Sequence, residues 1–302
     1  MDIDTIICGD CLEIMPQIPD KSVNLAILDL PYNINKAEWD KVPEYNGFVA
    51  NVFTQCERVL KDNGSLYWFH NDFNTIVDIY TWLRDNSRFV FRQFIVWDKF
   101  KGAFTHQKQK SKQLRNYPKL VEYILYYTFP PDDSRFVEYM QREKEKAGLK
   151  TCSQINRLLG VAEKCGGIAS HYFSKKPGFK QYYFPTREKY RRLQTTGYFT
   201  RDYDEFRREY EAGRHIYNNQ KSHYSVWNYP IELISGHITP KPIRLIENIM
   251  IHSSNEGDTV LDPTAGSGTT AVACKRNNRH YICIEKEPEY CAIAEKRIVE
   301  ML

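Results

Sequence analysis

The sequence predicts an α/β protein in which helices cover both faces of a sheet. Two observations along the 302 residues predict this class. Short apolar runs without alternating polarity recur, and such runs are typical of buried parallel strands. Longer segments with helical spacing of apolar residues separate them, as in a layered α/β sheet. The composition, 42% hydrophobic and 26% charged, is that of an ordinary globular protein.

Strands and helices alternate over the first 128 residues. The apolar runs predict strands at residues 5–8, 23–28, 65–69, 89–97 and 121–128. Helical periodicity predicts helices at residues 48–60 and 73–83. Asp62-Asn63-Gly64 is expected to end the first of these helices, and Pro130-Pro131 closes the block.

The same pattern resumes after Trp227. It predicts helices at 241–252, 269–276 and 289–301 and strands at 259–262 and 281–284, with Pro242 in a first helical turn. The middle segment differs: it predicts charged helices at 136–149 and 203–213. Between them, 153–159 and 167–173 have the size of a helix-turn-helix. We therefore divide the chain into a main domain, residues 1–128 and 226–302, and an inserted region, residues 129–225.

The positive charge is concentrated in the inserted region. Residues 129–225 carry 19 Lys+Arg and 12 Asp+Glu, and 17 of the 37 Phe and Tyr. This composition suits a polyanion with stackable bases, or a solvated helical surface over an aromatic core. A second basic stretch, 99–119, contains seven Lys+Arg and no acid. It supplies candidate phosphate contacts: Lys99, Lys101, Lys108, Lys110, Lys112 and Arg115.

The chain has no apolar run of the roughly 20 residues that span a bilayer, and its first residues lack the features of a signal peptide. We therefore expect a cytoplasmic protein without membrane contact, whose eight cysteines are reduced thiols. Cys8 and Cys11 form a C-x-x-C without a second pair at zinc-finger spacing, so no metal is expected.

A glycine motif predicts a cofactor site. Residues 261–270, Leu-Asp-Pro-Thr-Ala-Gly-Ser-Gly-Thr-Thr, lie between a predicted strand and a predicted helix. The two glycines allow close approach of a ligand, and the helix N-terminus offers free N–H groups. The next strand ends in Glu285, whose carboxylate can accept hydrogen bonds from both hydroxyls of a ribose. The pattern indicates an adenosine-containing cofactor; the phosphate loop of a dinucleotide oxidoreductase is incomplete.

A second motif, Asp29-Leu30-Pro31-Tyr32, directly follows the strand at 23–28. Ligands bind at the carboxyl ends of strands in open α/β sheets. A carboxylate, a rigid turn and an aromatic ring form a plausible clamp for a planar base bearing an amine. Taken singly, Asp29 could be a cap and Tyr32 a surface anchor.

Together the two motifs resemble those of the DNA amino-methyltransferases, whose signatures are D-P-P-Y and D-P-F-x-G-S-G-T-T. The motif order is similar to the circularly permuted β group of that family. Supporting matches are Gly9-Asp10-Cys11, Trp97-Asp98-Lys99 and the segment 237–242. The resemblance covers residues 3–128 and 226–300. It implies a Rossmann-like methyltransferase fold, with a mixed seven-stranded sheet and a mainly helical target-recognition region at 129–225.

The resemblance also implies a reaction and a site. S-adenosylmethionine would methylate N6 of a flipped-out adenine in double-stranded DNA, with Asp29, Leu30, Pro31 and Tyr32 as catalytic residues. The implied cofactor residues are Asp10, Cys11, Asp29, Lys241, Asp262, Thr264, Ala265, Gly266, Ser267, Gly268, Thr269 and Glu285. Leu30 departs from the family's proline but keeps its carbonyl, and Thr264 departs from its phenylalanine.

Other functions remain open from the sequence. N4-cytosine methylation uses the same geometry on another exocyclic amine, and a catalytically inert DNA-binding partner could retain the fold. RNA and protein substrates are compatible with the fold class alone. The family resemblance further suggests a homodimer and a cognate restriction endonuclease as possible partners.

Overall fold

The chain folds into two compact units. In this computed structural model, unit 1 comprises Met1–Pro130 and His215–Leu302, and unit 2 comprises Pro131–Arg214. The structure describes residues 3–34, 37–99, 120–130, 132–161, 171–173, 183–218 and 224–300. In unit 1, the Asn218 N–H donates to the His252 carbonyl at 2.7 Å, which ties the first residues after the boundary to this unit. No helix in these ranges is long and apolar enough to cross a membrane.

Unit 1 is built on a mixed sheet whose described strands follow the order β1-β8-β7-β2-β3-β5-β4-β6. The strands are β1 (Thr5–Cys8), β2 (Val23–Leu28), β3 (Leu60–His70), β4 (Val90–Asp98), β5 (Val121–Thr128), β6 (Val226–Asn228), β7 (Thr259–Asp262) and β8 (His280–Glu285). Among the strands that the structure describes, β5 alone is antiparallel to its neighbours, β3 and β4. The predicted Rossmann-like α/β class is confirmed, with eight described strands where seven were expected. The added strand, β6, has three residues and pairs with β4 at the sheet edge.

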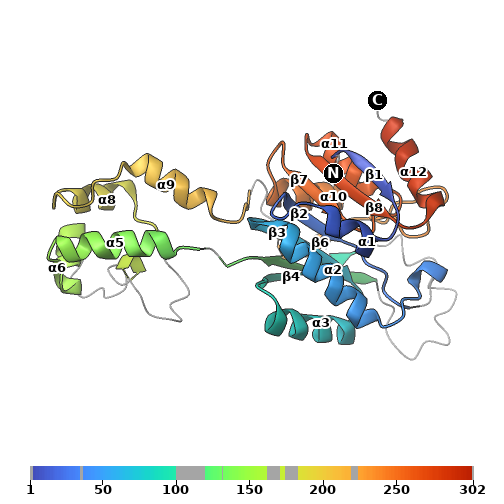
Figure 1. Cartoon of the computed structure of the whole chain (residues 1–302), viewed down its shortest axis with the longest axis horizontal. Helices are drawn as coiled ribbons and strands as arrows, with labels where there is room; N and C mark the ends of the chain where they lie inside the picture. Colours follow the sequence, from blue (N-terminus) through green and yellow to red (C-terminus); the bar gives the residue numbers. More distant parts are fainter. Residues whose placement is uncertain are drawn as a thin grey trace. The chain divides into compact units, whose positions relative to one another are not determined.

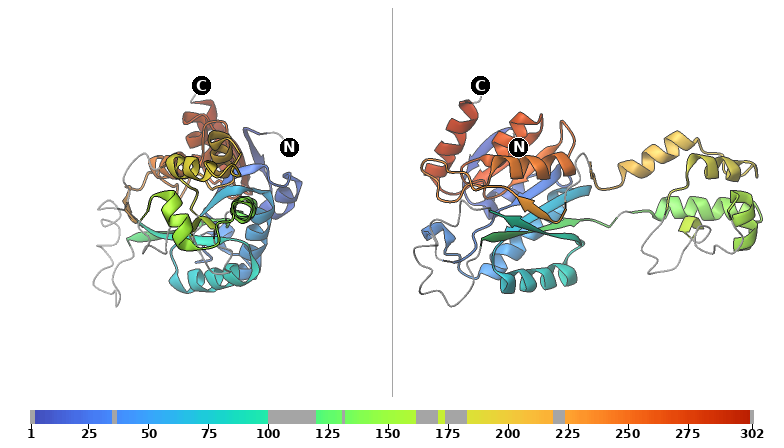
Figure 2. Two further views of the ribbon diagram at one scale, coloured as in Figure 1. Left: turned by 90° about the vertical axis from the view of Figure 1, so that its left-hand side faces the viewer. Right: turned by 180° about the vertical axis from the view of Figure 1, so that it is seen from behind.

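Helices cover both faces of this sheet, as Figures 1 and 2 show. They are α1 (Cys11–Ile14), α2 (Tyr45–Val59), α3 (Phe73–Asn86), α10 (Ile243–Ser253), α11 (Thr269–Arg276) and α12 (Pro288–Val299), with 3-10 turns at Met15–Gln17 and Glu38–Asp40. Because neighbouring residues of a strand face opposite sides, β2 sends Ala26 and Leu28 into the core under α1, α2 and α3. Leu25 and Ile27 enter the core under α10 and α11. Strand β2 therefore lacks an alternation of polar and apolar residues because both of its faces are buried.

Two local predictions in unit 1 were wrong. Asp62-Asn63-Gly64 was expected to end the helix and to precede the next strand, but helix α2 already ends at Val59 and these residues belong to β3. The β2–β3 register shifts between Val23 and Leu25, so the polar residues are accommodated by a local irregularity. Pro242 is the N-cap of α10 and not part of its first turn.

Unit 2 is a small helical unit with an aromatic core. Its described helices are α5 (Ser134–Lys146), α6 (Cys152–Leu159), α8 (Arg187–Gln194) and α9 (Tyr203–Ala212). Helix α8 was not predicted. Of the expected helix at 167–173, only residues 171–173 are described, and they are helical.

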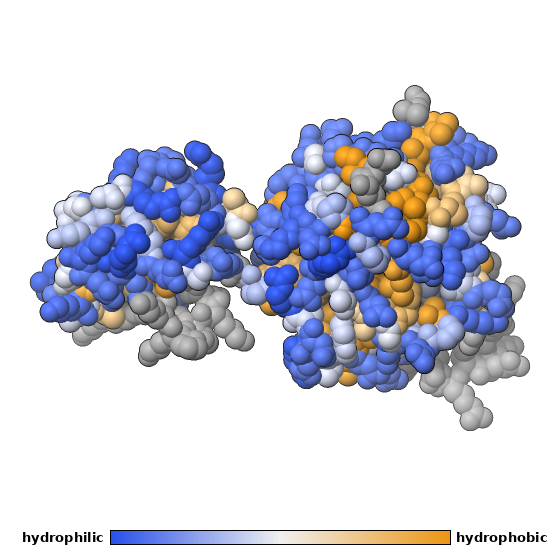
Figure 3. Space-filling view, viewed as in Figure 1, coloured by the Kyte–Doolittle hydropathy of each residue, from blue (hydrophilic) through white to orange (hydrophobic). Residues whose placement is uncertain are grey.

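The aromatic residues of unit 2 serve its core. Phe136, Tyr190, Phe199 and Phe206 are almost fully buried within one cluster. The surface of this unit is mainly hydrophilic, as the left-hand part of Figure 3 shows. Of the two interpretations of the aromatic-rich segment, the aromatic core under a solvated surface accounts for these side chains.

Candidate active site

The two motifs open onto one cavity of about 630 Å³ in unit 1. Asp29 and Pro31, which follow β2, lie on its wall together with the glycine loop after β7. The ends of β1 and β8 contribute Asp10 and Glu285 to the same wall. The cavity therefore lies at the carboxyl ends of four neighbouring parallel strands, where open α/β sheets bind ligands.

Most of the predicted site residues line this cavity. They are Asp10, Cys11, Asp29, Pro31, Lys241, Asp262, Thr264, Ala265, Gly266, Ser267, Thr269 and Glu285. Leu30 lies between Asp29 and Pro31, and Tyr32 follows Pro31, but neither belongs to this wall. Gly268 lies at the start of α11. Among the predicted phosphate contacts, only Lys99 is described; the other five, Lys101, Lys108, Lys110, Lys112 and Arg115, lie outside the described residues.

The glycine loop is held by the aspartate that ends β7. Asp262 accepts hydrogen bonds from the Thr264 N–H at 3.1 Å and from the Thr270 hydroxyl at 2.5 Å. Burial raises the pKa of Asp262 to about 7. Gly266 has φ +53, and a Cβ there would lie 2.7 Å from Nε2 of His237. The loop thus needs glycine at this position for both its backbone conformation and its close contact.

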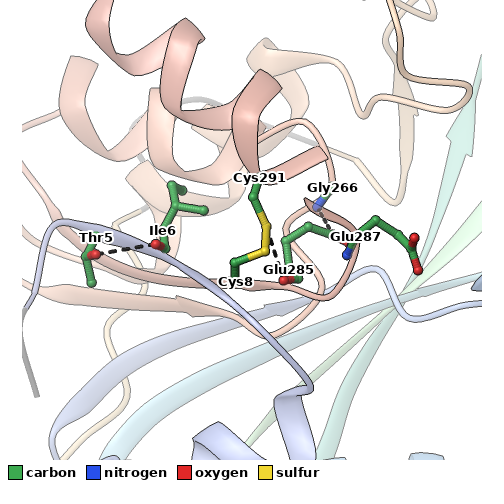
Figure 4. Close-up of a disulfide and its surroundings, with 7 residues drawn as sticks. All are labelled: Thr5, Ile6, Cys8, Gly266, Glu285, Glu287 and Cys291. Carbon is green, nitrogen blue, oxygen red and sulfur yellow. Dashed lines mark hydrogen bonds between the residues drawn. A yellow bond between two sulfur atoms is a disulfide. The ribbon is translucent and has the colours of Figure 1, made fainter. Parts of the chain in front are cut away.

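Glu285, at the end of β8, binds the backbone of the glycine loop. One carboxylate oxygen accepts the Gly266 N–H at 2.7 Å, and the other accepts the Glu287 N–H at 2.8 Å (Figure 4). Each oxygen keeps a further lone pair, so the carboxylate can also accept ligand hydroxyls. Burial raises the pKa of Glu285 above its ordinary value. The arrangement fits a ribose, the group for which the sequence predicted this residue.

The segment after β1 completes the wall beside Glu285. Asp10 caps helix α1 by accepting the Leu12 N–H at 2.9 Å. The Gly9 N–H donates to the Glu285 carbonyl at 2.8 Å, which joins the ends of β1 and β8. Cys11 is buried, and this burial raises the pKa of its thiol to about 12. Cys11 is therefore a neutral, apolar wall residue at neutral pH.

A disulfide joins Cys8 and Cys291 next to this wall (Figure 4). The expectation that all eight cysteines are free thiols was therefore wrong. Cys8 ends β1 and Cys291 lies in the first turns of α12, and packing of this helix on the strand brings their Cα atoms to 6.0 Å. The described free cysteines are Cys11, Cys56, Cys152, Cys274 and Cys283. No group of three or more metal-ligating side chains occurs among the described residues.

Asp29 belongs to a cluster of charged side chains with Lys241, Glu122 and Lys99. The Lys241 ammonium forms an ion pair with the Asp29 carboxylate and lies 3.6 Å from Glu122. Lys99, a predicted phosphate contact, pairs with the other oxygen of Glu122. The Tyr32 hydroxyl lies 3.1 Å from Asp29 and 3.2 Å from Glu122. Lys99 therefore balances a buried carboxylate, and its contact with DNA stays a prediction.

The pKa values in this cluster follow from burial and neighbouring charge. Burial, followed by the Asp29 and Glu122 carboxylates, raises the pKa of Tyr32 well above its ordinary value. Burial opposes ionisation of Glu122, but Lys241 and Lys99 outweigh it and lower the pKa of that carboxyl. Burial likewise opposes the charge of Lys241, but Asp29 and Glu122 raise its pKa. Tyr32 is thus a neutral hydroxyl between two charged pairs.

Several residues of this site were missed by the sequence analysis. Asp40 is buried and accepts backbone N–H groups of Tyr32 (2.7 Å), Asn33 (2.9 Å) and Ile34 (2.9 Å), so it fixes the loop after Pro31. Glu122 lies in strand β5 between apolar neighbours. A single acid inside an apolar strand is a signal that could have identified Glu122. Asp40 carried no comparable pattern.

Comparisons with known proteins agree with this geometry. A sequence model of the family described as DNA methylase (N6_N4_Mtase) matches residues 23–296. The type II methyltransferase M1.MboII of Moraxella bovis is 29% identical over 299 residues, which cover 96% of this chain and 94% of that protein. The DNA adenine methyltransferase YhdJ of Escherichia coli (strain K12) is 28% identical over 305 residues, 97% of this chain and 82% of that protein.

A solved structure shares the fold. The M1.HpyAVI–SAM complex superimposes with a TM-score of 0.54 at 20% identity, covering 97% of this chain and 98% of that one. At this identity the likeness establishes the fold and no more. The family match, in contrast, extends over nearly the whole sequence and includes both motifs at the cavity. The chain therefore belongs to the DNA methylase family.

Proposed function

We propose that this protein transfers the methyl group of S-adenosylmethionine to the N6 amine of adenine in double-stranded DNA. The observation that carries the proposal is the shared cavity, in which Asp29 and the glycine loop face the same space. The relatives support the choice of reaction, since one is a type II methyltransferase and another a DNA adenine methyltransferase.

The cavity wall fits the proposed cofactor. Glu285 offers lone pairs to ribose hydroxyls, Asp10 and Cys11 would lie against the adenine ring, and the loop 264–268 would hold the methionine end. Gly266 lets His237 pack closely against the loop, because a Cβ at this position would lie 2.7 Å from Nε2 of His237. When bound, the cofactor supplies an electrophilic sulfonium methyl group. Lys241, one of the predicted cofactor residues, pairs with Asp29 in this structure and also lies on the cavity wall.

Asp29 and Leu30 would activate the amine. The lone pair of an exocyclic amine is delocalised into the base, so it is a weak nucleophile. The Asp29 carboxylate and the Leu30 carbonyl can each accept a hydrogen bond from one N–H group of the amine. These bonds favour a pyramidal nitrogen and stabilise the positive charge that develops during transfer. Pro31 restricts Leu30 to extended conformations and so directs that carbonyl. The surplus proton then leaves to Asp29 or to water.

The target base must leave the duplex to reach the cavity, which costs a few kcal/mol. Stacking on an aromatic ring contributes about 1–3 kcal/mol per base, and Tyr32 is the ring next to Asp29. Asp40 holds the backbone of this tyrosine in place. We assign to Tyr32 the role of stacking against the extruded adenine.

Unit 2 supplies a surface suited to the DNA backbone. A depression in it is lined by Arg135, Arg142, Lys146 and Arg201, with Tyr198 and Glu143. Cations gathered on one surface favour binding of phosphates. This supports the assignment of residues 129–225 to target recognition. The homodimer and the cognate restriction endonuclease that the sequence resemblance suggests as partners stay predictions.

Nucleoside mass analysis of duplex DNA incubated with the protein and S-adenosylmethionine tests the proposal. N6-methyladenine is the expected product. N4-methylcytosine would instead support the second activity in the family name. Absence of both products, together with absence of cofactor binding in calorimetry, would indicate an inert DNA-binding partner. Asp29→Ala should abolish transfer while cofactor binding persists, and near-normal turnover of this variant would refute the role of Asp29.

A further inference from the structure

Glu122 is a buried carboxylate outside the two motifs, and it shares the partners of Asp29. It lies in β5, between strands β3 and β4, and its side chain is 8% exposed. Removing a carboxylate from water costs several kcal/mol unless other groups compensate its charge. Two ammonium groups and a hydroxyl compensate it here: Lys99, Lys241 and Tyr32. An apolar side chain could fill this position in the strand without any compensating charge, so packing alone does not explain a glutamate here.

The shared partners couple Glu122 to Asp29. The Tyr32 hydroxyl carries one proton and lies within 3.2 Å of both carboxylates, so it can donate to only one of them at a time. The Lys241 ammonium has three protons and touches both acids. Two carboxylates and two ammonium groups make the cluster neutral as a whole. Each shared donor can therefore shift towards Glu122 without leaving a net charge.

Such a shift is what the proposed reaction needs. In this structure Lys241 and Tyr32 both donate to the Asp29 carboxylate. A target amine must compete with these donors for the same oxygens. If Asp29 were the only counter-ion of Lys241, releasing this lysine would leave a buried ammonium unpaired. Glu122 removes that penalty, because it retains both donors when Asp29 turns to the substrate.

We propose that Glu122 is a positioning residue for methyl transfer, which holds Lys241 and the Tyr32 hydroxyl so that Asp29 can accept the hydrogens of the target amine. This inference rests on the proposed function. Glu122 does not belong to the wall of the cavity, so it acts through Asp29, Lys241 and Tyr32. Its removal should slow transfer more than it weakens binding of cofactor or DNA.

Glu122→Gln tests the inference, because the amide keeps the shape of the side chain and loses its charge. We expect kcat to fall about 10- to 100-fold, the range for losing a hydrogen bond to a charged group. The KM values for DNA and S-adenosylmethionine should change less than about threefold. Glu122→Asp, which keeps the charge on a shorter side chain, should recover part of the loss. Glu57→Gln is the matched control, since Glu57 lies outside the cluster and pairs with Arg88 at 2.9 Å.

A double variant covers the case in which Glu122→Gln does not fold because Lys99 is left unpaired. Glu122→Gln with Lys99→Gln removes one charge of each sign, so the cluster stays neutral. Its kcat should remain low while calorimetry shows cofactor binding, because Lys241 still lacks its second acid. Wild-type kcat in either folded variant would overturn the inference. So would an equal loss in Glu57→Gln, or a loss of cofactor affinity that matches the loss of kcat. A wild-type protein without methyl transfer would instead overturn the proposed function on which the inference rests.

Discussion

The Thr264 hydroxyl donates a hydrogen bond to the Asp29 backbone carbonyl at 3.1 Å. These residues are 235 positions apart, and the bond joins the glycine loop directly to the Asp29 loop. Thr264 stands where the resemblance led us to expect phenylalanine. The threonine thus loses an aromatic wall but gains a polar link between the two halves of the site. This hydrogen bond fixes the position of the Asp29 loop, the proposed acceptor of the amine, relative to the proposed cofactor loop.

Thr264→Val should remove the hydrogen bond that links the glycine loop to the Asp29 loop. The substitution keeps the shape of the side chain and leaves the Asp29 carbonyl without this donor. A neutral hydrogen bond contributes about 1 kcal/mol, so we expect kcat/KM to fall about fivefold, measured by transfer of labelled methyl groups to DNA. Thr264→Ser, which keeps the hydroxyl, should remain close to the wild type. Equal activities of the valine and serine variants would show that the bond has no functional role.

Gly266→Ala should disrupt the cofactor loop. Its positive φ already disfavours alanine, and the new Cβ would lie 2.7 Å from His237. Gly257 is a matched control, because it has φ +80 and open space around the position of a Cβ. Gly257→Ala should therefore show only the conformational cost of about 1 kcal/mol in urea unfolding. Calorimetry should show at least about tenfold weaker cofactor binding for Gly266→Ala alone, a loss of about 1.4 kcal/mol. Comparable cofactor affinities in the two variants would contradict the contact with His237.

The sheet of unit 1 could be predicted because its strands carry a strong local signal. The runs at β2 and β5 are mainly apolar, with Asn24 and Glu122 as exceptions, because helices cover both faces of the sheet. The glycine loop has its own residue pattern. Strand β6 could not be predicted, because its three residues depend on pairing with β4 across a long sequence separation. Helix α8 has a low apolar content, and its stability depends on Tyr190 and Leu193 entering a core formed by other helices.

The site could be predicted only where function imposes a motif. Asp29, Gly266 and Glu285 could be predicted, because each lies at or after the end of a predicted strand and has a residue type suited to ligand binding. Asp40 and Glu122 owe their positions to three-dimensional folding: one bonds to the backbone of a neighbouring loop, and the other compensates lysines from distant segments. The disulfide could not be predicted for the same reason, because Cys8 and Cys291 are separated by 283 residues.

Loss of the Cys8–Cys291 disulfide should destabilise unit 1. A bridge that closes a long loop restricts the unfolded chain, and removing one costs about 2–5 kcal/mol. Cys8→Ser with Cys291→Ser should lower the free energy of unfolding in urea by that amount, and dithiothreitol should affect the wild type but not this variant. Cys152→Ser, which changes an exposed free thiol, serves as the control. If the wild type unfolds identically with and without the reductant, the bridge does not contribute to stability.

The buried carboxyl of Asp262 should make stability depend on pH. Burial raises its pKa to about 7, whereas a carboxyl in the unfolded chain titrates near 4. Between these values the folded protein holds a proton that the unfolded chain releases. The contribution of Asp262 is therefore fully present below about pH 4 and is lost as the pH rises to about 7, at up to about 1.4 kcal/mol per pH unit.

Asp262→Asn isolates this contribution from the titration of other groups. The amide does not titrate, and its oxygen can still accept one of the two hydrogen bonds from Thr264 and Thr270. We expect the difference in unfolding free energy, wild type minus variant, to decrease between pH 5 and pH 7 in urea titrations. A difference that increases over this range would show that the hydrogen bonds lower the pKa of Asp262 by more than burial raises it. An ionised carboxylate would then anchor the glycine loop towards pH 7.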